Sequence, residues 1–142
     1  MIREATEADA GALADLLTQL GYPTTLEQAR ARLQRILPDP AWATLLFEER
    51  GRVLGFGGIQ VCASYEHDTS VARIVAMVVD AAVRRRGVGA ELVAALERRA
   101  VTMGAGKIVV TSAMRREDAH AFYEKLGYGR TGLRFGKALP SS

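Results

Sequence analysis

The segment VVDAAVRRRGVGAEL holds the residue types and the spacing best suited to chemistry in this chain. An apolar run leads into Arg84, Arg85 and Arg86, and Gly87 and Gly89 then open a helical pattern. Backbone N–H groups at a helix start have no intrahelical partner and attract anions, phosphate in particular. Glycine removes the Cβ atoms that would keep a phosphate from the backbone, and arginine adds charge-assisted hydrogen bonds. The segment therefore predicts a diphosphate-binding loop, with a solvated arginine cluster at an ordinary helix start as the alternative.

Two well-known phosphate-binding loops do not match this segment. The dinucleotide-binding fingerprint requires a third glycine at the position where Leu92 stands. A P-loop requires Gly-Lys followed by Ser or Thr, and that triplet is absent from the sequence. A phosphate loop of another kind is therefore expected.

A second informative segment, AHAFYEKLGY, runs from Ala119 to Tyr128. Together the two segments resemble the GNAT superfamily of acetyl-CoA-dependent N-acetyltransferases. The spacing Arg84-x-x-Gly87-x-Gly89 is similar to the family's Gln/Arg-x-x-Gly-x-Gly/Ala loop, and the second segment is similar to its A-x-x-F-Y-x-x-x-G-F/Y motif. The family's closing strand is matched by Phe135, Lys137 and Leu139.

The resemblance implies that acetyl-CoA binds as a co-substrate, mainly through backbone groups. The end of the strand before the loop would pair with the pantetheine arm as an added strand would, through Met77, Val78 and Val79. The N–H groups of the loop would hold the pyrophosphate. That loop comprises Arg84 in the motif's first position, followed by Arg85, Arg86, Gly87, Val88, Gly89 and Ala90.

The resemblance also implies a direct transfer, in which a neutral primary amine attacks the thioester. Tyr123 matches the tyrosine that protonates the departing thiolate, and a backbone group at Val78 or Val79 polarises the carbonyl oxygen. The structural alternative for Tyr123 is an aromatic side chain that packs in the core or at an interface. The expected acceptor is a small-molecule amine, with a peptide or protein amine as the less favoured choice.

The general base is left open because the sequence departs from the family at Arg73. Histone-acetylating relatives have a glutamate there, whereas an arginine cannot accept a proton at neutral pH. Arg73 also hints at an acceptor that carries an acidic group. The remaining candidates for the base are Glu48, Glu49, Glu66, His67 or a water molecule.

Arg116 is a second departure. It stands where many relatives carry an asparagine that contacts pantetheine. Its guanidinium suits a CoA phosphate or the acceptor instead, so we count it among the candidate cofactor-binding residues.

The hydrophobic pattern predicts the elements that must position these residues. Helical spacing predicts three longer helices and one short one, over residues 10–20, 26–37, 87–103 and 117–126, with Thr24 and Glu27 forming a capping box before the second. Strands are expected over residues 2–4, 41–48, 53–63, 71–80, 107–112 and 128–139, the fourth being apolar enough to be covered on both faces. The fold class is therefore α/β. The resemblance implies a mixed, mostly antiparallel central sheet with helices on both faces.

Length and composition place further limits on the chain. Its 142 residues, 49% hydrophobic and 25% charged, predict one globular domain over residues 1–142. A single cysteine, Cys62, excludes an intrachain disulfide and zinc sites of the paired-cysteine type, and no metal is expected. The charged N-terminus lacks a signal-peptide core, and no apolar run reaches the ~20 residues of a membrane span, so a cytoplasmic protein without membrane contact is expected.

The charge balance gives little support to nucleic-acid binding. The chain has 19 basic and 16 acidic residues, a formal net charge of +3. A basic nucleic-acid-binding domain is one alternative function, resting on the arginine runs at 84–86, 98–99 and 115–116. A non-catalytic acyl-CoA-binding module of the same fold is the other. Relatives commonly form dimers, so the resemblance also implies a homodimer as a partner state.

Overall fold

The computed structural model describes residues 1–84, 86–111, 117–132 and 135–141 of the chain. They fall into two compact units, Met1–Val110 and Thr111–Ser142. The first contains a sheet and three α-helices, and the second contains helix α4 (Glu117–Lys125). The expectation of one domain over the whole chain stays a prediction.

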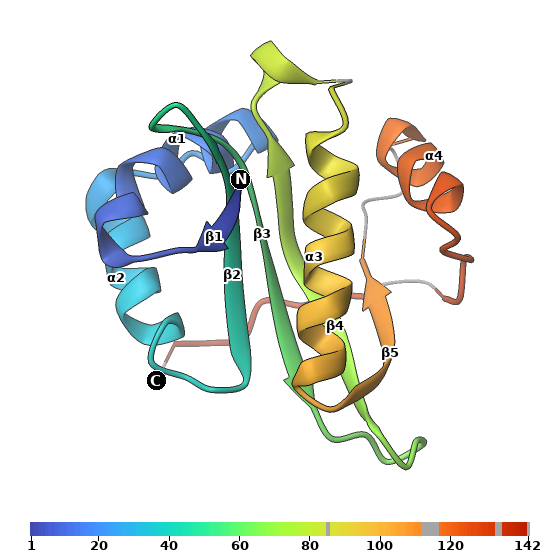
Figure 1. Cartoon of the computed structure of the whole chain (residues 1–142). Helices are drawn as coiled ribbons and strands as arrows, with labels where there is room; N and C mark the ends of the chain where they lie inside the picture. Colours follow the sequence, from blue (N-terminus) through green and yellow to red (C-terminus); the bar gives the residue numbers. More distant parts are fainter. Residues whose placement is uncertain (85, 112–116, 133–134, 142) are drawn as a thin grey trace. The chain divides into compact units, whose positions relative to one another are not determined.

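The first unit is built on a sheet whose strands follow one another in chain order (Figure 1). Neighbouring strands are antiparallel from the first to the fourth, because hairpins or helix-containing connections return the chain beside itself, and the fifth is parallel to the fourth. The mixed, mostly antiparallel sheet is confirmed. Its strands are β1 (Ile2–Glu4), β2 (Trp42–Glu49), β3 (Arg52–Cys62), β4 (Ser70–Val79) and β5 (Ala105–Val110).

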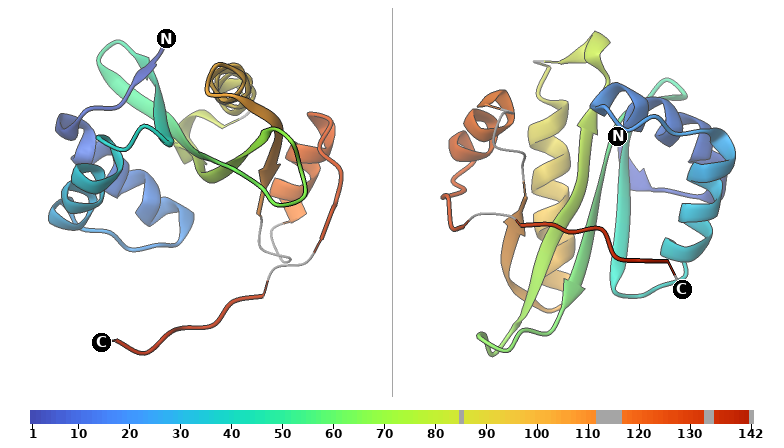
Figure 2. Two further views of the ribbon diagram at one scale, coloured as in Figure 1. Left: turned by 90° about the horizontal axis from the view of Figure 1, so that it is seen from below. Right: turned by 180° about the vertical axis from the view of Figure 1, so that it is seen from behind.

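Helices cover both faces of this sheet, as the resemblance implies (Figure 2). The alternation of strand β3 shows the two faces. Phe56 packs in a cluster with helices α1 (Ala10–Leu20) and α2 (Leu26–Ile36), whereas Gly55 and Gly57 lie against helix α3 (Val88–Thr102). Successive residues of a strand point to opposite faces, so one strand serves both layers.

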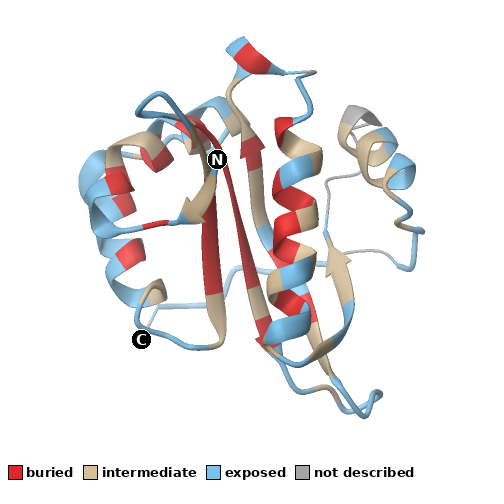
Figure 3. Cartoon of the chain, in the orientation of Figure 1, coloured by how far each residue is buried: buried red, intermediate tan, exposed pale blue. Residues whose placement is uncertain are grey.

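The core lies between the sheet and these helices (Figure 3). Its largest fully buried side chains come from every layer and are Leu16, Leu46, Ile59, Leu92, Leu96 and Val93. Burying one such side chain stabilises the fold by about 1.5–3 kcal/mol. This core fixes the positions of the strand ends and helix ends of the first unit.

Helix α2 begins at Leu26 as predicted, but its capping pair is shifted by one residue. Thr25 is the cap: the Gln28 N–H donates to Thr25 Oγ1 at 3.1 Å, and the Thr25 N–H donates to Gln28 Oε1 at 3.0 Å. The predicted capping box of Thr24 and Glu27 is wrong. The sequence pattern Thr-x-x-Glu/Gln is satisfied both by that pair and by Thr25 with Gln28, so it does not distinguish them. Thr24 instead donates its hydroxyl to the Tyr22 carbonyl at 2.7 Å.

The predicted last strand is not found in the part of 128–139 that the structure describes. Residues 128–132 and 135–141 have no regular secondary structure. A strand is stabilised by its ladder with a neighbour, and this segment pairs with no described strand. Three glycines, Gly129, Gly132 and Gly136, lower its strand propensity further.

Candidate functional site

The candidate site begins where β4 and β5 stop pairing. Their parallel pairing runs from Ser70 opposite Ala105 to Ile74 opposite Val110. The second half of β4 continues without β5 beside it, and Figure 1 shows the orange β5 accompanying only the start of the yellow-green β4. On its other edge β4 stays paired with β3 up to Val79, which faces Gly55. No strand among the described residues pairs with this edge of β4 beyond Ile74, so the edge suits a ligand that adds as a strand would.

A bulge in β4 lies at the start of this open stretch. Ile74 pairs with Ile59 and Ala76 pairs with Gly58, which leaves Val75 as an extra residue opposite no partner on β3. A bulge bends a strand and raises its local twist. The bulge therefore accounts for the point at which β4 departs from β5.

The direction of the backbone groups on the open edge follows from the β3 side. The Asp80 N–H donates to the Leu54 carbonyl on β3 at 2.8 Å. Successive N–H groups of a strand point to opposite edges, so those of Met77 and Val79 point to the open edge. Of the two residues expected to polarise a carbonyl, Val79 has the suitable orientation and Val78 faces β3.

The exit from β4 is held by Asp80. Its carboxylate accepts the Ala82 N–H at 2.9 Å and pairs with Arg52 at 3.1 Å. The Ala82 N–H, followed by the Arg52 guanidinium, holds the pKa of Asp80 below its ordinary value. The side-chain oxygen of Gln19 on α1 accepts the N–H of Ala81 at 2.9 Å. The turn after the open edge thus has a defined course.

Helix α3 begins directly after this turn with an open N-terminus. Gly87 is the N-cap, with φ 81°, and no side chain caps the helix there. A Cβ at Gly87 would meet no atom within 4 Å, so the space beside it is open. Val88, only 3% exposed, anchors the first turn in the core. The predicted diphosphate loop therefore has the geometry of an anion-binding helix start.

The arginines of the loop have different environments. Arg84 is exposed, whereas the guanidinium of Arg86 pairs with Glu49 at 3.0 Å. Arg85 lies outside the described residues. The Arg86–Glu49 pair links the loop to the end of β2.

Tyr123 lies on α4, in the second unit. Its ring contacts Phe122 at a centroid distance of 5.1 Å and Tyr128 at 5.6 Å, both edge to face. The side chain is half-buried. Arg116 lies outside the described residues, so its predicted contact with CoA stays a prediction.

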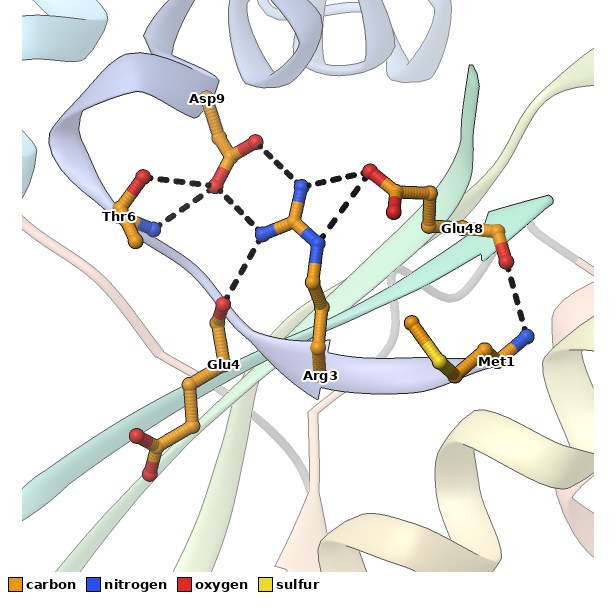
Figure 4. A network of polar contacts seen from close by, with 6 residues as sticks. All are labelled: Met1, Arg3, Glu4, Thr6, Asp9 and Glu48. Carbon is orange, nitrogen blue, oxygen red and sulfur yellow. Dashed lines mark hydrogen bonds and ion pairs between the residues drawn. The ribbon is translucent and has the colours of Figure 1, made fainter. Parts of the chain in front are cut away.

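Two of the candidate general bases are engaged in ion pairs. Glu48 accepts from Arg3 at 2.9 Å in a network that also contains Asp9 (Figure 4). Glu49 pairs with Arg86, as described above. Glu66 and His67 are exposed in the loop before β4.

A cavity that the sequence did not reveal lies between helices α1 and α2 and the sheet; we call it the α1–α2 cavity. Its volume is about 190 Å³. Its walls are apolar and include Leu13, Leu33, Trp42 and Phe56, and the bulge residue Val75 also lines it. Its one charged lining residue among the described residues is Arg32. Arg32 lies three positions after the buried Ala29, at the edge of the apolar face of α2. Helical periodicity by itself does not distinguish a residue at this edge that lines a cavity from one that is only solvated.

The cavity also corrects the expectation that β4 is covered on both faces. Ala72 and Ile74 are buried, but Arg73 and Val75 on the opposite face are exposed. The face that carries Arg73 and Val75 is therefore not fully covered by helices α1 and α2 among the described residues.

A family model described as the acetyltransferase (GNAT) family matches residues 12–128. The chain belongs to the GNAT family of acetyltransferases. This GNAT acetyltransferase is 30% identical to the aminoalkylphosphonate N-acetyltransferase of Salmonella typhimurium, over 97% of its own length and 90% of that protein's.

Solved structures give the same fold. A GNAT family acetyltransferase from Staphylococcus aureus superposes with a TM-score of 0.83 at 25% identity, covering 98% of each chain. An aminoglycoside N-acetyltransferase in complex with CoA superposes with a TM-score of 0.87 at 19% identity, covering 99% of this chain and 95% of that one. The second likeness concerns the fold alone.

No group of three or more His, Cys, Asp or Glu side chains that could hold a metal ion occurs in the described part of the chain. None of the helices found there is long and apolar enough to cross a membrane.

Proposed function

We propose that this GNAT acetyltransferase transfers an acetyl group from acetyl-CoA to the primary amine of a small molecule. The observation that carries the proposal is the open edge of β4, followed at once by the uncapped start of α3. The relative at 30% identity is named as an acetyltransferase of aminoalkylphosphonates, which favours a small amine over a protein amine as the acceptor.

The described residues fit acetyl-CoA in two places. The N–H groups of Met77 and Val79 suit an extended pantetheine arm, which pairs with a strand edge. The space beside Gly87 and the uncapped N–H groups of Val88, Gly89 and Ala90 suit a diphosphate. Arg84 and Arg85 supply positive charge to the same loop. Arg86 of that loop is paired with Glu49, and we retain it and Arg116 as candidate contacts to a phosphate or, for Arg116, to the acceptor.

The protein's own contribution to the transfer is positioning and proton donation. When bound, acetyl-CoA supplies an activated thioester that a neutral amine attacks. The Val79 N–H stabilises the negative charge that develops on the carbonyl oxygen, and Tyr123 donates a proton to the departing sulfur. Both roles need only weak groups in fixed positions, because the leaving thiolate is a good one.

We propose that water removes the proton from the acceptor amine. Glu48 and Glu49 are neutralised by Arg3 and Arg86, which makes both poor candidates for a free base. The described residues that line the α1–α2 cavity include no carboxylate or imidazole. Arg73, in the position of the histone-acetylating relatives' glutamate, cannot serve.

A substitution in the loop tests the proposal. We expect Gly89→Glu to abolish CoA binding, measured by calorimetry, and acetylation of an amine panel, measured as thiol release. The added side chain puts bulk and negative charge where the diphosphate is expected. An acidic residue in the first turn of a helix favours the helix, so the fold should persist.

The matched control is Val101→Glu, which adds the same side chain at an exposed position near the other end of α3. It should leave CoA binding and turnover unchanged. If Gly89→Glu binds CoA with wild-type affinity, the loop is not part of the CoA-binding site. Tight CoA binding by the wild type without transfer to any amine would favour the non-catalytic module.

A further inference from the structure

One arginine lines the α1–α2 cavity, and a second, from a different element, lies on the same face of the sheet. Arg32 of α2 lines it directly. Arg73 of β4 lies on the face of the sheet that carries the cavity. Trp42 lines the cavity and pairs with Gln60 of β3, and Gln60 in turn pairs with Arg73. Residues directly opposite each other in antiparallel strands have side chains on the same face. Both cations therefore stand on the side of the sheet where the cavity opens.

Neither arginine is neutralised by a carboxylate in the part of the chain that the structure describes. The arginines that do have an acidic partner within 4 Å there are Arg3, Arg30, Arg52, Arg86, Arg99 and Arg130. The guanidinium of Arg32 meets only the hydroxyl of Thr24, at 3.4 Å, among the contacts of described residues. This border of the cavity is consequently positive and able to bind an anion.

The rest of the cavity suits an apolar group of limited size. Its floor is formed by the register row of Thr44, Gly58 and Ala76, with Val75 in the bulge beside it. Gly58 has no side chain, so the cavity is deeper at this position. This deeper part lies beside the bulge, where the open edge of β4 begins. The volume of about 190 Å³ equals that of roughly six water molecules at about 30 Å³ each, which is enough for one aromatic ring or a short alkyl chain.

We propose that the acceptor is a primary amine with an apolar body and a distal acidic group, a carboxylate or a phosphonate, that Arg32 binds. The apolar body occupies the α1–α2 cavity, and the amine points toward the bulge at Val75. Arg32 recognises the two oxygens of the acid through its planar pair of N–H donors, and Arg73 adds attraction from β4. This inference rests on the proposed acetyltransferase function and names its substrate class.

A set of three para-substituted benzylamines tests the proposal, of which the benzoate and the benzamide are close in shape. We choose para-(aminomethyl)benzoate, para-(aminomethyl)phenylphosphonate and the neutral para-(aminomethyl)benzamide, with acetyl-CoA as the donor. We expect the wild type to have a kcat/KM roughly tenfold or more higher for each acid than for the amide, because a hydrogen bond to a charged group is the stronger kind. The ratio between the two acids identifies the preferred one.

Arg32→Gln should abolish most of that preference by raising KM for the acids, while kcat and the KM for acetyl-CoA stay near their wild-type values. The matched control is Arg35→Gln, which removes an exposed arginine from the last turn of the same helix. It should retain the preference. Equal kcat/KM for acids and amide in the wild type, or the same loss in both variants, would overturn the proposal.

Direct binding separates this inference from the proposed function. Calorimetric titration of the CoA-saturated wild type and of Arg32→Gln with the benzoate and the benzamide needs no turnover. Tighter binding of the benzoate that disappears in Arg32→Gln supports the acidic class even if no amine is acetylated, in which case the proposed function fails by itself. No binding of the benzoate, or equal binding of both probes, refutes the acidic class.

Discussion

Two roles are proposed for Tyr123, packing and proton donation, and both suit a half-buried tyrosine. Its ring packs edge to face against Phe122 and Tyr128. Those contacts belong to the ring carbons, whereas proton donation needs the hydroxyl. Removing the hydroxyl and keeping the ring therefore distinguishes the two roles.

We expect Tyr123→Phe to lower kcat by roughly 10²-fold or more, which is the usual contribution of a general acid. The affinity for CoA should stay near wild type, because the aromatic contacts of the ring remain. Tyr128→Phe removes the neighbouring hydroxyl and serves as the control, with unchanged turnover. Wild-type kcat in Tyr123→Phe would assign the residue to packing alone.

Strand β3 shows at the scale of an element why glycines recur in this sheet. A Cβ at Gly55 would lie 2.9 Å from the Val78 carbonyl oxygen and 3.1 Å from Leu92 Cδ1. A Cβ at Gly58 would find its nearest neighbours at 3.7 and 3.8 Å, an ordinary contact distance. The first glycine therefore allows β3, β4 and α3 to approach closely, and the second leaves room in the α1–α2 cavity.

We expect Gly55→Ala to destabilise the fold by about 1–3 kcal/mol, the usual cost of forcing an extra methyl into a packed core. Urea unfolding measures this free energy. CoA binding should weaken as well, because β4 must shift beside its open edge. Gly58→Ala is the matched control and should lose less than about 1 kcal/mol. Equal stability losses in the two variants would contradict the close approach at Gly55.

The stability of the whole molecule depends in part on the polar network at the start of the chain. Arg3 binds both oxygens of Asp9, at 2.8 and 3.0 Å, and also reaches Glu48 (Figure 4). The Arg3 guanidinium holds the pKa of Asp9 below its ordinary value, against the opposing effect of burial. A carboxyl whose pKa is lower in the folded state stabilises the fold above its ordinary pKa, and this stabilisation is lost as the pH falls through the folded-state pKa.

We expect Asp9→Asn to lower the free energy of unfolding by about 1–3 kcal/mol at about pH 7, because it removes a charge-assisted pair from a nearly buried site. The difference from wild type should begin to shrink as the pH falls below the ordinary aspartate pKa of about 4, and it should disappear only below the lower folded-state pKa of Asp9. Urea unfolding at several pH values measures this. Asp15→Asn, an exposed carboxyl on α1, should show no such dependence. A difference that stays constant down to about pH 3 would contradict the role of Asp9.

Most elements could be predicted from local patterns, because period and turn residues are properties of neighbouring positions. The helices at 10–20 and 87–103, the strands of the sheet and the glycine loop were placed within one or two residues. The prediction of Thr24 as the cap was wrong because two overlapping residue pairs satisfied the same capping pattern. The prediction of a strand at 128–139 was wrong because a strand needs a neighbouring strand, which the local sequence does not identify.

The sequence by itself indicated the family and placed the run from Arg84 to Ala90 at the start of a helix, because both depend on short runs of adjacent residues; anion binding by this run stays a prediction. Only the tertiary structure decided that β5 leaves β4 at Ile74, that Glu48 and Glu49 are paired with arginines, and that Arg32 lines the α1–α2 cavity on the sheet face that also carries Arg73. Each of these facts joins residues far apart in the chain, and pairing register and helix packing, which bring them together, are set by contacts across the whole core.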